Sequence, residues 1–103
     1  MFGNNEEYKG QGLYSVYDSK AQVFWSPSPA LNHQVALRSF AEAANRAGSP
    51  VGDHPEDYSL FFVGYWNEKT GVAKSMPHQA LGVATNYLKN VLQAPVMDNL
   101  PRR

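Results

Sequence analysis

Residues 58–67 read YSLFFVGYWN, and this stretch decides the fold class. Apolar and aromatic side chains occupy both alternating sets of positions, which is typical of a β-strand. Leu60 and Phe62 belong to one set, and Phe61 and Val63 belong to the other. We predict that the face carrying Leu60 and Phe62 packs against helices.

Three further strands are predicted around this one. Residues 13–17 and 21–25 are rich in Val, Tyr, Phe and Trp, and such residues favour strands. Asp18-Ser19-Lys20 between them indicates a β-hairpin. After residues 58–67, the segment Glu68-Lys69-Thr70-Gly71 supplies a turn, and a short partner strand follows over 72–75.

Two helices complete the prediction. Asn32 is a suitable N-cap for a helix over 33–47, in which apolar residues recur at helical spacing. A second helix is predicted after Ser75, with Pro77 in its first turn and Pro95 as its stop. Its apolar face is formed by Leu81, Ala84, Leu88 and Val91 or Leu92. The order ββαββα predicts an α+β fold: an antiparallel sheet of about four strands with two helices packed on one face.

Length and composition narrow the function classes. A chain of 103 residues supports one domain, predicted over 13–93 between a flexible lead-in over 1–12 and a C-terminal tail over 94–103. The chain has no cysteine, so disulfides and thiolate metal sites are excluded. Its formal net charge is zero, which does not by itself favour nucleic acid. No apolar run reaches the ~20 residues that cross a bilayer, and no signal peptide is recognised.

No motif predicts catalysis, a metal centre or a cofactor. His33, His54 and His78 lie in unrelated segments without the spacing of metal ligands, and we expect them to face solvent. The acidic run around His54 (residues 53–57) is open to interpretation as a weak cation site or an acid/base pair. We favour a turn in which Asp53 caps the backbone and proline restricts φ. An enzyme with a carboxylate site near His54 is therefore the least favoured function.

The aromatic side chains indicate more about function than the histidines and acidic residues do. Two helices can cover only one face of the predicted sheet, so part of this set must lie on the open face or in an interface. Three interpretations follow: a platform on which single-stranded nucleic acid stacks, a second core layer, or a dimer interface. The strand aromatics are Tyr14, Tyr17, Phe24, Trp25, Phe61, Phe62, Tyr65 and Trp66.

Several segments together resemble one family. They are residues 13–22 (LYSVYDSKAQ), 35–41 (VALRSFA), 53–61 (DHPEDYSLF), 63–64 (VG) and 68–71 (EKTG). The chain is similar over residues 13–75 to the small nonstructural protein of gokushovirus-type microviruses, which are single-stranded DNA phages. The resemblance implies a DNA-binding protein of phage genome replication or packaging in the host cytoplasm. It also implies no cofactor and no enzyme activity.

The leading hypothesis is a homodimer that binds single-stranded DNA non-specifically and has no small-molecule substrate or membrane partner. Aromatic rings would stack on bases, and basic side chains would meet phosphates. The candidates are Tyr14, Trp25, Tyr65, Lys20, Arg38, Arg46 and Lys74. The alternative is a protein–protein interaction module that engages a phage or host replication factor through the same aromatic surface. The two hypotheses differ in where the basic side chains should lie relative to the exposed rings.

Overall fold

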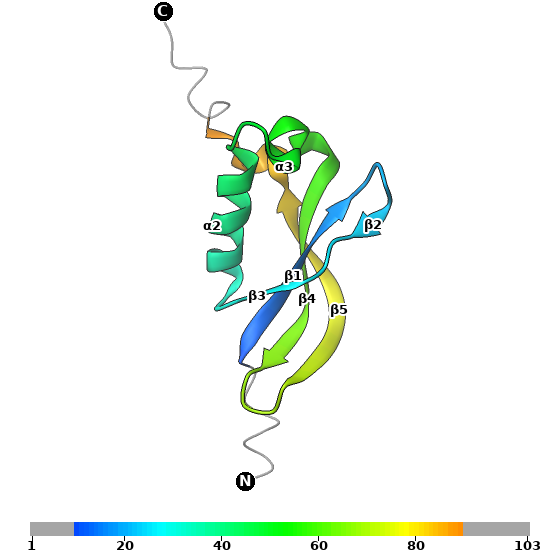
Figure 1. Cartoon of the computed structure of the whole chain (residues 1–103), viewed down its shortest axis with the longest axis vertical. Helices are drawn as coiled ribbons and strands as arrows, with labels where there is room; N and C mark the ends of the chain where they lie inside the picture. The colour runs from blue at the N-terminus through cyan, green and yellow to red at the C-terminus, as the bar shows by residue number, and fades with distance from the viewer. Residues whose placement is uncertain (1–9, 90–103) are drawn as a thin grey trace, which may run out of the picture.

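The computed structural model describes residues 10–89. They form a five-stranded antiparallel sheet in the order β2-β1-β4-β5, with β3 pairing beside β2 on the same edge of β1 (Figure 1). The strands are β1 (Gln11–Asp18), β2 (Val23–Phe24), β3 (Ser28–Ala30), β4 (Tyr58–Asn67) and β5 (Val72–Val83). The predicted class, α+β with an antiparallel sheet and helices, is confirmed.

The helices lie on one side of this sheet. Helix α2 runs alongside it, and the short helical segments gather near one end of α2 (Figure 1). Helix α2 spans His33–Ala44. The short segments are helix α3 (Pro50–Asp53) and the 3₁₀ turns η1 (Pro55–Asp57) and η2 (Ala84–Tyr87). Within the described residues, no helix has the length and apolar character needed to cross a membrane.

Helix α2 begins where the sequence predicts. The Asn32 side chain accepts a hydrogen bond from the Val35 N–H at 2.9 Å, which satisfies an N–H group that the helix itself leaves free. Ala36, Phe40 and Ala44 are buried and recur every fourth residue, so they form one stripe along the helix. The helix ends at Ala44, three residues earlier than predicted.

This stripe packs on the face of the sheet that carries Leu60 and Phe62. Both side chains are buried, with 4% and 6% of their surface exposed, and they belong to one core with Ala36 and Phe40. In the register of β1 and β4, Tyr14 lies opposite Phe62, so Tyr14 joins the same core. The prediction that the Leu60–Phe62 face meets the helices is confirmed.

The predicted second helix is wrong in the described part of the chain. Strand β5 continues through Ser75 and Pro77 to Val83. It pairs with β4 on both sides of the proline, and the pairing is irregular where Pro77 lies. A proline, which has no N–H, is tolerated there because β5 is an edge strand. Such a strand has a neighbour on one side only, so not every N–H has to donate a hydrogen bond within the sheet. The stretch that the prediction extended to residues 90–95 lies outside the described residues.

Two strand boundaries also differ from the prediction. Strand β1 begins at Gln11, so residues 11–12 belong to the sheet and not to the lead-in; residues 1–9 lie outside the described part. The predicted strand over 21–25 is shortened to β2 (Val23–Phe24), and a further strand, β3, pairs with β1 beyond the predicted range. Pro29 lies in β3 opposite Leu13, on a sheet edge, where a proline is tolerated. The predicted tail over 94–103 is not described.

Candidate functional site

The sheet divides its aromatic side chains between two faces. Tyr14 and Phe62 face α2, whereas Phe61 alternates to the opposite face. There Phe61 meets Phe24 and Tyr17, and Phe24 also meets His78, with ring centroids 5.3 Å apart. We call Tyr17, Phe24, Phe61 and His78 the open-face cluster. Phe24 and His78 come from β2 and β5, the two ends of the strand order, so their contact shows that the sheet is curled.

The open-face cluster is only partly covered. Phe24 keeps 44% of its surface exposed, and its neighbour Val23 keeps 49%. The Phe24 ring lies 4.6 Å from the Tyr17 ring between centroids. The cluster is therefore a small apolar layer on the face opposite α2 that keeps part of its aromatic surface exposed.

A pocket of about 380 Å³ lies on the other face, where α2 begins beside β1 and β4. We call it the helix–sheet pocket. It is lined by Gly10, Gly12, Tyr14, Leu31, Asn32, His33, Gln34, Phe62 and Tyr65. None of these nine lining residues carries a carboxyl group, so the pocket has no built-in repulsion toward an anionic ligand. Its volume falls in the range of pockets that bind small ligands.

Aromatic rings form the inner wall of the helix–sheet pocket. Tyr14 is 5% exposed, and its hydroxyl lies 2.7 Å from Nδ1 of His33. The Phe62 ring lies 5.0 Å from the His33 ring and 5.1 Å from the Tyr65 ring between centroids. Gly12 is required beside them, because a Cβ at this position would overlap the Tyr14 ring. Burial, and next the nearby Tyr65, raise the pKa of Tyr14 above its ordinary value.

One predicted aromatic–basic pair lies together at this pocket. Tyr65, which lines the pocket, stands opposite Lys74 in the register of β4 and β5. Cross-strand partners have Cβ atoms about 5 Å apart on the same face of the sheet. Lys74 is exposed and lies beside the pocket, whose lining residues do not include it. Tyr14 is buried in the core and offers no open ring face for stacking.

The other predicted basic residues are dispersed. Lys20 lies in the turn after β1, whereas the pocket is lined by residues near the start of that strand. Arg38 is exposed and lies two positions from both buried residues Ala36 and Phe40. At 100° per residue, this places Arg38 on the side of α2 that faces away from the sheet. Arg46 is exposed just beyond the C-terminal end of α2.

Trp25, the remaining predicted residue, has an acidic neighbourhood. Its ring packs against Tyr58 with centroids 5.4 Å apart, and 37% of its surface is exposed. Partial burial, followed by the charges of Asp18 and Asp57, raises the pKa of Tyr58. These two carboxylates make the surroundings of Trp25 unfavourable for a phosphate. Of the seven residues selected from sequence, only Tyr65 and Lys74 therefore form a compatible pair.

His33 is the pocket residue that sequence reasoning missed. It was expected to face solvent, but it is partly buried and contacts Tyr14 and Phe62. Its place directly after the N-cap Asn32 puts it in the turn of α2 that meets the sheet, but spacing alone does not reveal a partner nineteen residues away. His54 and His78 are exposed, as predicted.

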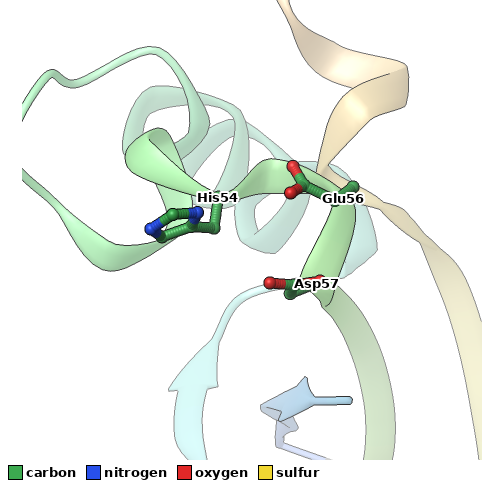
Figure 2. Close-up of side chains that lie close together, drawn as sticks. All are labelled: His54, Glu56 and Asp57. Atoms are coloured by element: carbon green, nitrogen blue, oxygen red, sulfur yellow. The ribbon is translucent and has the colours of Figure 1, made fainter. Parts of the chain in front are cut away.

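The acidic run forms a separate cluster. Figure 2 shows His54, Glu56 and Asp57 around the short turn η1, and the nearest possible ligand atoms of all three lie within 4.8 Å of one another. Glu56 and His54 are exposed, and Asp57 is half-buried. The adjacent Asp53 accepts a hydrogen bond from the Gly48 N–H at 3.0 Å, which is the capping role predicted for it. We therefore interpret the segment as a structural turn.

Comparison with known proteins identifies a matching family. A family model described as "Phage ORF5 protein" matches residues 11–87, which span the fold from the start of β1 to the end of η2. No curated protein and no solved structure matches the chain.

Proposed function

This chain belongs to the phage ORF5 protein family, and from that premise we propose that it binds single-stranded DNA non-specifically during genome replication or packaging. The resemblance to the nonstructural protein of gokushovirus-type phages supports this proposal, and the host cytoplasm is where we propose that the protein acts. The observation that supports it most is the pairing of Tyr65 with Lys74 at the helix–sheet pocket.

Each part of this arrangement suits one part of a nucleotide. A base can stack on the exposed part of the Tyr65 ring, and such stacking contributes about 1–3 kcal/mol for each base. The Lys74 ammonium group can meet the adjoining phosphate. No residue that lines the pocket carries a carboxylate, so none of them repels that phosphate. A base in a duplex is held in its stack, so this pocket favours a single strand.

A homodimer fits a site of this size. One stacked base and one phosphate contact give weak binding, whereas two linked sites on a single strand raise the apparent affinity through effective concentration. The half-exposed open-face cluster offers an apolar surface through which two copies could associate. Aromatic residues are enriched in such interfaces.

The same open-face cluster also supports the alternative function, engagement of a protein partner. Phe24 and Val23 are exposed there. In the turn before β2, the carboxylate of Asp18 accepts a hydrogen bond from the backbone N–H of Lys20 at 3.0 Å, so a negative and a positive side chain lie close together in the sequence. A surface with exposed aromatic rings and balanced charge suits a protein more than a polyanion.

Fluorescence polarisation of the full chain with labelled oligonucleotides of about thirty bases, at several salt concentrations, tests the proposal. We expect a single strand to bind more tightly than a duplex of the same length. Lys74→Ala should reduce the salt-dependence slope by about 0.7, the value for one phosphate contact. Tyr65→Ala should weaken binding without changing the slope, because stacking releases few counterions.

Arg38→Ala is the matched control, because Arg38 is exposed on the far side of α2. It should leave both affinity and slope unchanged. If the wild-type chain fails to bind single strands at low salt, the DNA proposal is wrong and the protein-partner function is favoured.

A further inference from the structure

The hydrogen bond between Tyr14 and His33 determines what His33 can offer inside the helix–sheet pocket. The Tyr14 hydroxyl is buried, and a buried O–H group that lacks an acceptor is costly. Nδ1 of His33 lies 2.7 Å from the Tyr14 oxygen, and we assign it the acceptor role because the buried hydroxyl requires one. A neutral imidazole that accepts at Nδ1 carries its own proton at Nε2, so His33 offers the pocket an N–H donor.

Asn32 is restricted in the same way by its role as the N-cap. Its Oδ1 atom accepts from the Val35 N–H at 2.9 Å, which leaves the side-chain NH₂ group, a donor of two hydrogen bonds. Asn32 and His33 both line the pocket. Two neighbouring side chains that line the pocket together with Tyr65 therefore each carry a donor group.

We propose that these donors make the pocket select bases that carry a keto group, thymine and guanine, over bases that carry an amino group. This inference rests on the proposed function, because it concerns the base that stacks on Tyr65. Thymine O4 and guanine O6 are acceptors, whereas cytosine and adenine place an N–H₂ donor at the same ring position. A donor facing His33 or Asn32 would leave both groups without an acceptor.

The preference for a keto base applies to the one nucleotide in the pocket, and the identity of the bases at the other positions of the strand does not affect binding. One hydrogen bond gained or lost predicts about a threefold to tenfold difference in affinity. Binding therefore remains broad in sequence, with stacking and phosphate contacts common to every base.

Oligodeoxyuridine and oligodeoxycytidine of equal length provide the test, because uracil and cytosine differ at ring position 4 as keto and amino forms. In fluorescence polarisation at low salt, the full chain should bind the uridine strand about threefold to tenfold more tightly. His33→Phe keeps an aromatic ring and removes the donor, so the ratio should approach one. Asn32→Ser retains a helix-capping oxygen and removes the amide donors, so it should also lower the ratio.

His78→Phe is the matched control, because His78 belongs to the open-face cluster; the ratio should be unchanged in this variant. Circular dichroism melting would confirm that each variant is folded. Equal wild-type affinity for the two strands would overturn the base preference while leaving DNA binding intact. A preference that survives in both His33→Phe and Asn32→Ser would overturn the assignment to these residues. Absence of binding to either strand would overturn the DNA function together with this inference.

Discussion

The side chain of Asn45 is hydrogen-bonded to the backbone of Tyr87, forty-two residues later in the chain. Its Nδ2 atom donates to the Tyr87 carbonyl oxygen at 2.9 Å, and its Oδ1 atom accepts from the Lys89 N–H at 2.9 Å. Nδ2 also donates to the Ala41 carbonyl oxygen at 2.8 Å. One amide group at the end of α2 thus joins this helix to the backbone of the segment that follows β5.

Asn45→Ala should therefore destabilise the protein. It removes hydrogen bonds at the joint between α2 and η2, each of which contributes about 0.5–1.5 kcal/mol. Because Asn45 is exposed, water replaces part of this energy, and we expect a loss of about 1–2 kcal/mol in chemical denaturation. Asn86→Ala, at a nearby exposed position, should change stability by less than about 0.5 kcal/mol. Equal effects of the two substitutions would contradict the structural role of Asn45.

Phe62→Ala should be among the most damaging core substitutions. The side chain is 6% exposed and contacts Tyr14, His33 and Tyr65, so truncation leaves a cavity and should cost about 3–5 kcal/mol. Phe24→Ala, in which the replaced ring is 44% exposed, should cost markedly less because much of that ring already contacts water. A loss under about 1 kcal/mol for Phe62→Ala would show that this face of β4 does not meet the helices.

Alkaline pH should weaken the fold in part through Tyr14. Its folded pKa is raised above the ordinary value of 10.0, so in the interval above pH 10 the folded state retains a proton that the unfolded state releases. The contribution of Tyr14 is therefore fully present below pH 10 and is lost as pH rises through the folded pKa. Urea denaturation across this interval should show a shallower decline for Tyr14→Phe than for the wild type.

At neutral pH, the same Tyr14→Phe variant should be less stable by about 0.5–1.5 kcal/mol, because the hydrogen bond to His33 is absent. Superimposable pH profiles for the variant and the wild type would show that Tyr14 does not cause the alkaline loss.

Millimolar calcium or magnesium should leave the melting temperature unchanged. The cluster of His54, Glu56 and Asp57 is largely exposed, and a calcium site requires a denser set of oxygen ligands than this turn provides. A ligand that binds only the folded state raises the melting temperature. A rise that is present in the wild type and absent in Asp57→Asn would reveal a cation site at this cluster.

Local patterns were sufficient for part of the fold. The alternation through Leu60 and Phe62 predicted the buried face of β4, because successive side chains in a strand point to opposite faces. Asn32 predicted the start of α2, because capping involves only residues three positions apart. These features depend on neighbours in the chain, so they could be predicted from the sequence.

The β5 segment and the candidate site depended on tertiary structure. Ser75 and Pro77 have the pattern of a helix start, but pairing with β4 makes the segment a strand, and an edge position tolerates the proline. Tyr65 and Lys74 could both be selected from sequence, yet only the register of β4 and β5 places them opposite each other. The contact of Tyr14 with His33 likewise arises from packing α2 on the sheet. Sequence determines what each residue can do locally, whereas long-range pairing decides which residues meet, because that choice depends on the burial and hydrogen bonding of the whole sheet.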